Sequence, residues 1–159
     1  MLDYMKISKR FFCCYSGLSR SELAEILRVR RSTVTMFDSK GLVPWSKLKY
    51  LSDSQGVSWD WIIEGYEPKK SRKEAKTPRS TTPKFNRVGI NRRYLSLFPK
   101  MNLTQIAEIV GVTPNVVSGW KLNKRMVPWE RLQSAVDMFG VRWDWLVDGI
   151  QPKLREWTP

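Results

Sequence analysis

Two nearly identical segments contain the acidic side chains that come closest to a catalytic pair. The segments are "VSWDWIIEG" (57–65) and "VRWDWLVDG" (141–149). Paired carboxylates perform general acid–base chemistry when both face a substrate in a pocket. Asp60 and Glu64, however, are only i,i+4 neighbours on one helical face, and the second segment repeats this spacing. We therefore interpret both segments as structural, with one tryptophan inside a core and the other at its edge.

Residue types that carry other catalytic chemistry are scarce in this sequence. It contains no histidine, the commonest general base and metal ligand. Its only cysteines, Cys13 and Cys14, are adjacent, so they form neither a disulfide framework nor a zinc site, and we expect reduced thiols. Neither glycine-rich phosphate-binding motif occurs. These observations predict a protein that is not an enzyme and that needs no cofactor and no metal ion.

Charge is the main functional signal in the composition. The 159 residues carry a formal net charge of +13 and a pI near 10.0. Such a balance favours a polyanionic partner, with nucleic acid ahead of an acidic membrane surface. No apolar run approaches the roughly 20 residues that span a bilayer, and the start "MLDYMKISKR" is too polar for a secretory signal. We therefore expect a cytoplasmic protein with no membrane partner.

The sequence aligns with itself over most of its length. Two blocks without gaps, 23–37 on 106–120 and 42–69 on 126–153, share eighteen identical residues, and 7–19 aligns with 90–102 at the same offset as the first block. This repetition predicts two copies of one domain. The predicted boundaries are 1–68 for the first copy, 69–87 for a linker, 88–153 for the second copy and 154–159 for a short tail.

The predicted linker is "KKSRKEAKTPRSTTPKFNR" (69–87), with eight basic residues and one acidic residue. Its prolines, its Ser/Thr clusters and its lack of an apolar period are typical of a flexible segment. It carries a net charge of +7, more than half of the excess over the whole chain. Its basic side chains are candidates for phosphate contacts: Lys69, Lys70, Arg72, Lys73, Lys76 and Arg79.

Each copy has the pattern of five short helices and no convincing strand, so the predicted class is all-α. Apolar residues recur three and four positions apart between Tyr4 and Leu18. Capping-box patterns, Ser19 with Glu22 and Asn102 with Gln105, predict second helices at 20–27 and 103–110. After a three-residue turn come the third helices, and Pro114 fits the first turn of the second one. We expect Pro44 and Pro128 to open the fourth helices, Trp59 and Trp143 to begin the fifth, and Gly56, Gly65, Gly140 and Gly149 to end helices.

The second and third predicted helices form a recognisable pair in each copy. Small Ala24 and Ala107 permit a close approach, and residues such as Val34 and Val117 seat the third helix through one apolar face. Two short helices joined by a tight turn, with the outer face of the second one free, are typical of a helix-turn-helix. The major groove of DNA, about 12 Å wide, admits one such helix.

The shared pattern A-E-I-[LV]-x-V-x-x-x-x-V-x-x-[FW], V-P-W-x-x-L and G-V-x-W-D-W-[IL]-x-x-G resembles the Xre/Cro, or lambda-repressor-like, helix-turn-helix family. The nearest branch is the helix-turn-helix domain of phage CI-type repressors. The resemblance implies two five-helix domains of this fold, joined by the basic linker. It further implies a sequence-specific regulator of transcription that binds double-stranded DNA. We expect a phage or mobile-element repressor, associated with the bacterial nucleoid, whose two heads bind a bipartite operator.

The resemblance assigns roles by position. It places base contacts at Arg31, Ser32, Thr35 and Met36 in the first copy and at Pro114, Asn115, Ser118 and Gly119 in the second. Arg20, Arg30, Lys121 and Lys124 suit phosphate contacts. Arg31 fits a bidentate contact to guanine and Asn115 one to adenine, whereas Gly119 offers only close approach. Because the two sets differ, the two heads are expected to prefer different sequences.

Two departures from the family pattern have consequences. The turn commonly needs a residue at positive φ, which Gly111 supplies in the second copy, whereas the first copy has Arg28 and predicts a strained or differently shaped turn. Full-length lambda-type repressors add a dimerisation and self-cleavage domain. Since only 154–159 follow the second copy, we expect no induction by self-cleavage.

Two other functions stay open. One is an architectural protein that coats DNA with little sequence preference, and the other is a protein-interaction module in which one copy dimerises. Apolar residues on the outer face of the third helix would favour a protein partner, whereas Arg31, Ser32, Asn115 and Ser118 favour bases. A homodimer and a contact with RNA polymerase stay open as additional partners.

Overall fold

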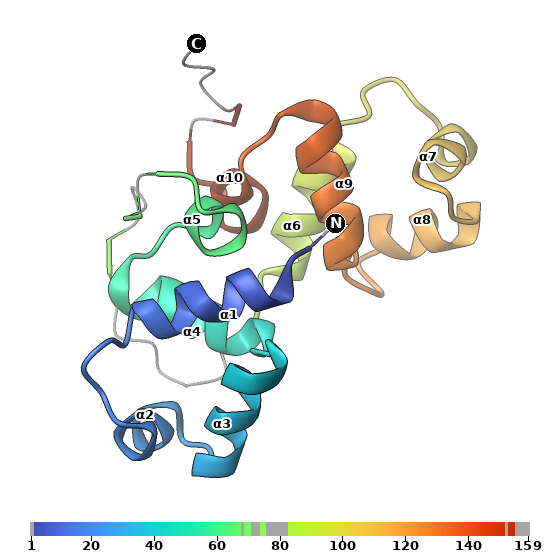
Figure 1. The fold of residues 1–159 in the computed structure, drawn as a ribbon. Coiled ribbons are helices and arrows are strands. Elements are labelled where there is room, and N and C mark those ends of the chain that lie inside the picture. The colour runs from blue at the N-terminus through green and yellow to red at the C-terminus, as the bar shows by residue number, and fades with distance from the viewer. Residues whose placement is uncertain (1, 68, 71–73, 76–82, 152, 155–159) are drawn as a thin grey trace. The chain divides into compact units, whose positions relative to one another are not determined.

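The computed structural model describes residues 2–67, 69–70, 74–75, 83–151 and 153–154. These residues form ten helices and no sheet, so the predicted all-α class is confirmed. The chain divides into two compact units, Leu2–Phe85 and Asn86–Pro159. Each unit contains five of the described helices (Figure 1).

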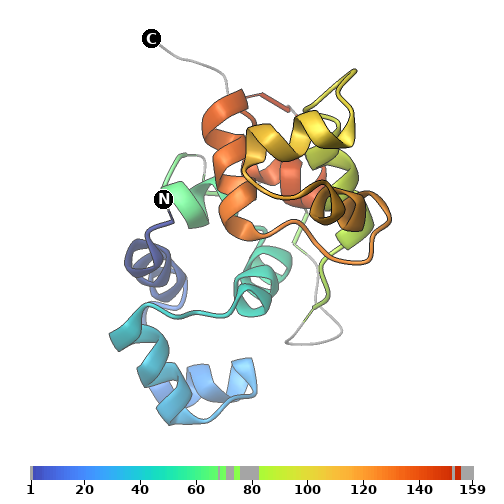
Figure 2. The same ribbon diagram turned by 90° about the vertical axis from the view of Figure 1, so that its right-hand side faces the viewer.

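The two units have the same order of helices. The first contains α1 (Tyr4–Cys13), α2 (Arg20–Leu27), α3 (Arg31–Lys40), α4 (Trp45–Gln55) and α5 (Trp59–Glu64), and the second contains α6 (Arg87–Leu95), α7 (Leu103–Val110), α8 (Pro114–Lys121), α9 (Trp129–Phe139) and α10 (Trp143–Asp148). Helix α2 packs on α3, and α7 packs on α8. Figure 2 shows the α2–α3 pair at one end of the first unit from a second direction. Within the described residues, none of the helices is long and apolar enough to cross a bilayer.

Local sequence signals define most of the helix ends. Both predicted capping boxes are present, Ser19 with Glu22 and Asn102 with Gln105, and α2 and α7 have the predicted bounds. The predicted glycine stops all end a helix in the left-handed region: Gly56, Gly65, Gly140 and Gly149. The prolines Pro44 and Pro128 are N-caps of α4 and α9. Helix α1 ends earlier than the apolar pattern suggested, at Cys13, and a turn then brings Tyr15 into the core.

Aligned positions form the core of each unit. The largest fully buried side chains of the first unit include Phe11, Phe37, Leu48 and Trp59, and those of the second include Tyr94, Trp120 and Trp143. One arginine joins the first helix of each unit to the end of its last helix. Arg10 Nη1 donates to the carbonyl oxygen of Ile63 at 2.8 Å, and Arg93 Nε donates to that of Leu146 at 2.9 Å. Cations at a helix C-terminus satisfy carbonyls that lack partners within the helix.

The repeated W-D-W segments are structural, and the predicted division into a core and an edge tryptophan holds in the first unit. Trp59 and Trp143 are fully buried, and each packs against the tryptophan that begins the preceding helix, with ring centroids 6.4 Å and 6.3 Å apart. Trp61 lies at the edge of its core under Lys69, whose Nζ is 4.7 Å from the ring centroid. Trp145 also lies under a lysine, with Lys153 Nζ 4.9 Å from the ring centroid, but it is 7% exposed, so the second unit buries both tryptophans and the predicted edge position is wrong there.

After its last helix, each unit folds back on itself in a way that the sequence did not predict. Isolated antiparallel bridges join Val57 to Lys70 and Val141 to Leu154. At the other end of the predicted linker, the ring of Phe85 packs on Trp59 with centroids 5.9 Å apart. Both ends of that segment thus take part in folded structure.

Candidate nucleic-acid interface

The turn between the paired helices has the same shape in both units. Arg28 ends α2 at φ 51° and ψ 53°, and Gly111 ends α7 at φ 65° and ψ 48°. The next residue of each turn donates its amide hydrogen back to the aligned alanine, Ala24 or Ala107, at 2.9 Å. We expected the turn at Arg28 to be either strained or differently shaped, and the second of these expectations is wrong. The turn has the same shape as the one at Gly111, and it places the Arg28 backbone in the left-handed region, which costs about 1–2 kcal/mol for a residue with a side chain.

Buried contacts hold α3 and α8 by their apolar faces. Val34 and Phe37 lie in the first core, and Val117 and Trp120 lie in the second. The first helix of each unit also donates a hydrogen bond to the last turns of the third helix. The Ser8 hydroxyl donates to the carbonyl oxygen of Phe37 at 2.8 Å.

The second unit has a stronger version of the same anchor, because Asn91 occupies the position aligned with Ser8. Its Nδ2 donates to the carbonyl oxygens of Trp120 and Arg125, each at 2.9 Å. Its Oδ1 accepts from the amide of Val127 at 3.0 Å. One amide that is 1% exposed thus holds both the end of α8 and the loop that follows it.

A second pair of aligned cations holds the turn. Lys47 Nζ donates to the carbonyl oxygen of Leu27 at 2.8 Å, and Arg131 Nη2 donates to that of Gly111 at 3.3 Å. Burial lowers the pKa of the Lys47 ammonium group. These contacts position α3 and α8 with their outer faces toward solvent.

The predicted base-contact residues gather on these outer faces, with one exception. Arg31, Ser32, Thr35, Pro114 and Asn115 are exposed, Met36 is 39% exposed, and Ser118 is half-buried. The Thr35 hydroxyl donates to the carbonyl oxygen of Arg31 at 3.2 Å, so its oxygen can still accept a hydrogen bond. The exception is Gly119, which is buried.

Arg125 covers Gly119 and is the residue that our sequence reasoning missed. A methyl group at Gly119 would lie 3.2 Å from Nε and 3.4 Å from Cδ of Arg125. The Arg125 amide donates to the carbonyl oxygen of Gly119 at 3.4 Å, and the residue is exposed. The signal was the loop itself, which is one residue longer in the second copy and contains two consecutive basic residues, Lys124 and Arg125.

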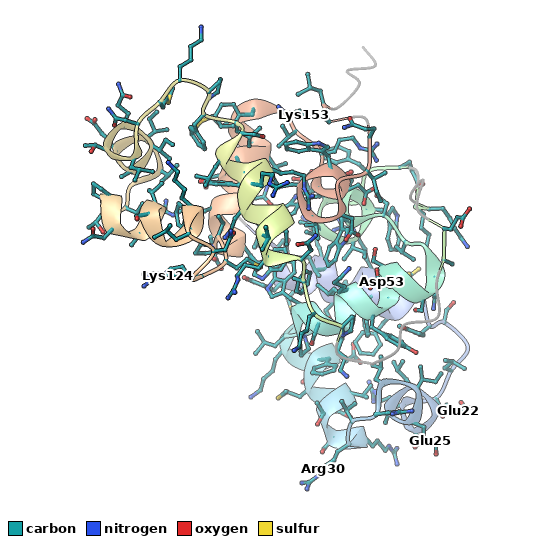
Figure 3. The ribbon with its side chains drawn as sticks, turned by 180° about the vertical axis from the view of Figure 1, so that it is seen from behind. Glu22, Glu25, Arg30, Asp53, Lys124 and Lys153 are labelled. Carbon is teal, nitrogen blue, oxygen red and sulfur yellow. The ribbon has the colours of Figure 1, made fainter. Side chains whose placement is uncertain are left out.

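The predicted phosphate-contact residues have different surroundings. Arg30 is the N-cap of α3 and extends into solvent, as does Lys124 after α8 (Figure 3). Lys121 is also exposed. Arg20 forms an exposed ion pair with Asp38 on α3. Such pairs contribute about 0–1 kcal/mol, so a phosphate could replace Asp38 at little cost.

The linker candidates divide into two groups. Lys69 lies over the Trp61 ring, and the backbone of Lys70 forms the bridge to Val57. The other four lie outside the described residues: Arg72, Lys73, Lys76 and Arg79. The structure therefore gives Lys69 a contact within its own unit.

The described residues contain no group of three or more His, Cys, Asp or Glu side chains that could hold a metal ion. Burial raises the pKa of the Cys14 thiol, which favours the protonated and unreactive form.

No family model, curated protein or solved structure matches the chain.

Proposed function

We propose that this protein is a sequence-specific regulator of transcription that binds double-stranded DNA through two lambda-repressor-like helix-turn-helix domains. The observation that carries the proposal is the duplicated support of α3 and α8. In both units aligned buried groups hold one short helix by its apolar face and its ends, and polar side chains occupy the outer face. A net charge of +13 supplies the attraction to a polyanion.

The two outer faces offer different chemistry to base edges. In the first unit, the Arg31 guanidinium suits the two acceptors of guanine in the major groove. In the second unit, the Asn115 amide suits the donor and acceptor of adenine. Since α3 and α8 differ at every proposed contact, the operator consists of two unlike halves.

Basic residues around each outer face supply phosphate contacts. Arg20 and Arg30 flank the first pair of helices, and Lys121 and Lys124 flank the end of α8. We add Arg125 to this set, because Asn91 fixes its backbone and Gly119 seats its side chain. Phosphate contacts fix the orientation of a protein on the duplex without specifying its sequence.

Repression by occupying a promoter is the output that we propose, in the cytoplasm of a bacterial cell. Activation would need an additional contact with RNA polymerase. A phage or mobile element is the proposed source, on the resemblance to CI-type repressors.

Selection of binding sites from random duplex DNA tests the proposal. The expected result is one enriched bipartite sequence, with its halves about 34 Å apart or at a multiple of that spacing, so that both heads meet the same face of the duplex. Random competitor DNA should displace the protein poorly from that site. A protein that binds the pool without enriching any sequence would instead be the architectural alternative. A protein that does not bind the pool would favour the protein-interaction alternative.

A further inference from the structure

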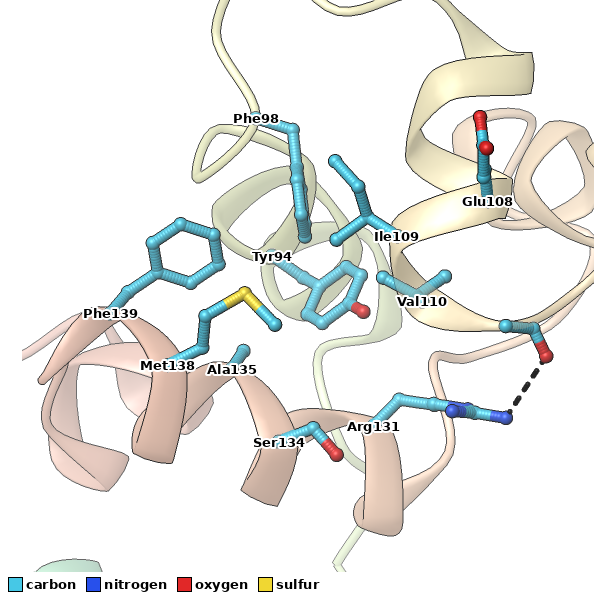
Figure 4. Close-up of a pocket in the computed structure, with 11 residues that line it drawn as sticks. Tyr94, Phe98, Glu108, Ile109, Val110, Arg131, Ser134, Ala135, Met138 and Phe139 are labelled. Atoms are coloured by element: carbon cyan, nitrogen blue, oxygen red, sulfur yellow. Dashed lines mark hydrogen bonds between the residues drawn. The ribbon is translucent and has the colours of Figure 1, made fainter.

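The second unit contains a pocket that the proposed DNA contacts do not use. It has a volume of about 280 Å³ and lies among α6, α7 and α9 (Figure 4). Most of its wall is apolar, with Phe98, Ile109, Val110 and Met138 around the space. A cavity of this size accommodates one aromatic ring with a short side chain, since an apolar cavity of about 150 Å³ already holds benzene.

One phenolic hydroxyl lies inside the pocket. It belongs to Tyr94, a residue that is 1% exposed and that forms part of the pocket lining. Figure 4 shows this hydroxyl among the lining side chains, between Val110 and Arg131. Burial raises the pKa of Tyr94 to about 12, so the hydroxyl keeps its proton at neutral pH and can donate it to an acceptor. A ligand oxygen that enters the pocket can accept a hydrogen bond from this hydroxyl.

The aligned place in the first unit has a different composition. Tyr50 stands where the second unit has Ser134. Burial, and after it the neighbouring Tyr50, raises the pKa of the Tyr15 phenol. Phe11 stands where the second unit has Tyr94, and Tyr15, with a buried hydroxyl, stands where the second unit has Phe98. The second unit thus has the small Ser134 in place of a tyrosine, and its phenolic hydroxyl comes from α6 itself.

Arg131 supplies a cation at the rim of the same pocket. Its Nη2 donates to the carbonyl oxygen of Gly111, the residue at positive φ between α7 and α8. The guanidinium has further N–H groups that can meet a carboxylate. Glu108 also lines the pocket, but Figure 4 shows its carboxylate directed away from Tyr94 and Arg131.

We propose that this pocket binds a small apolar carboxylate, with its hydrocarbon part among Phe98, Ile109 and Met138 and its carboxylate between the Tyr94 hydroxyl and Arg131. The ligand draws Arg131 away from the turn at Gly111 and so weakens the hold on α8. The binding site stands independently of DNA. Its effect on DNA affinity rests on the proposed function.

Titration of the full chain with 3-phenylpropionate, followed by backbone amide chemical shifts, tests the site. Saturable shifts are expected at Gly111, Arg131 and their neighbours, and none at the aligned residues Arg28 and Lys47. Ser134→Tyr, which copies the side chain of the first unit, should abolish these shifts while the rest of the spectrum is retained. Tyr94→Phe should weaken binding about 5–10-fold through the lost hydrogen bond.

Three results would overturn the proposal. The first is the absence of saturable shifts, and the second is equal binding of the neutral analogue 3-phenylpropionamide. The third is that the amide chemical shifts of the pocket residues change with protein concentration but not with added probe. The pocket would then be an interface between copies of the chain.

Adding 3-phenylpropionate to the protein bound to its selected duplex tests the second part. DNA affinity should fall in the parent protein and stay unchanged in Ser134→Tyr. A probe that binds without changing DNA affinity would refute only the link to α8. Failure of the protein to bind any duplex would refute the proposed function, while the titration would still decide whether the site exists.

Discussion

Under the proposed function, single side chains on α3 and α8 decide which bases the protein recognises. Changing Arg31 or Asn115 to alanine should cost about 1–3 kcal/mol at the selected site, because each removes a bidentate contact to one base. Binding to random duplexes should change much less. Titration of labelled specific and random duplexes measures both effects. Equal losses on the two kinds of DNA would move these residues to the phosphate-contact class.

Substitution of Gly119 should change helix stability and DNA affinity in opposite directions. Gly119→Ala should stabilise α8 by about 0.5–1 kcal/mol if Arg125 moves freely, because alanine loses less backbone entropy than glycine. The same change displaces the Arg125 side chain, so affinity for both specific and random DNA should fall, by about tenfold for a lost contact of ~1.4 kcal/mol. Arg125→Ala is the matched control and should weaken DNA binding equally. Unchanged affinity in both variants would show that Arg125 is not part of the interface.

At the residue scale, the residues that the resemblance assigned to base contacts are exposed for a reason that helix periodicity explains. Arg31, Ser32 and Asn115 lie on the outer faces because Val34 and Val117 lie in the cores. Prediction from the sequence missed Arg125 because a loop residue has no period, and its side chain position depends on a glycine six residues earlier. It also left out Asp38, whose pairing with Arg20 joins two helices and is invisible in either helix alone.

At the scale of elements, the buried tryptophans determine whether each unit is folded. Replacing Trp59 or Trp143 by alanine should destabilise its own unit by about 3–5 kcal/mol, since each side chain is fully buried. Replacing Trp61, which lies at the edge of its core, should cost less. Thermal unfolding followed by circular dichroism, with tryptophan fluorescence, measures the losses. A Trp59→Ala protein that melts normally but fails to bind DNA would contradict the structural assignment.

For the turn at Arg28 we predict a substitution that increases stability, whereas the tryptophan substitutions lower it. Arg28→Gly should stabilise the first unit by about 1 kcal/mol, because glycine removes the strain of a side chain at φ 51° at a smaller entropic cost. The aligned Gly111→Ala is the matched control and should destabilise the second unit. Chemical denaturation of the two variants measures both signs. A loss of stability in Arg28→Gly would show that the Arg28 side chain makes a contact worth more than the strain.

Helix ends were predictable because they follow local rules. Ser19 with Glu22 and the stop at Gly65 are specified within a few residues of the end itself. The bridge from Val57 to Lys70 was not predictable, because an isolated pair of residues has neither alternation nor length. The anchor from Asn91 to the carbonyl oxygen of Trp120 spans 29 positions, and in the sequence it was only one polar residue in an amphipathic helix.

At the scale of the whole molecule, the excess positive charge and the proposed base contacts belong to different parts of the chain. Residues 1–68 carry a net charge of +2 and residues 88–159 carry +4, whereas residues 69–87 carry +7. We therefore attribute much of the general attraction to DNA to the linker segment and the choice of sequence to α3 and α8. In the proposed complex both contributions act on the same duplex, so we expect the second head to bind from a high local concentration once the first is bound.

The central claim is that one chain binds one duplex through both heads. The most direct measurement compares the affinity of the intact protein for the selected bipartite duplex with its affinity for duplexes in which one half is scrambled. We predict a loss of about 10²–10⁴-fold when either half is scrambled, because the joint contribution of the second head disappears. The loss should be similar whichever half is changed. Unchanged affinity with one half scrambled would contradict the account, because a single unit would then do all of the binding.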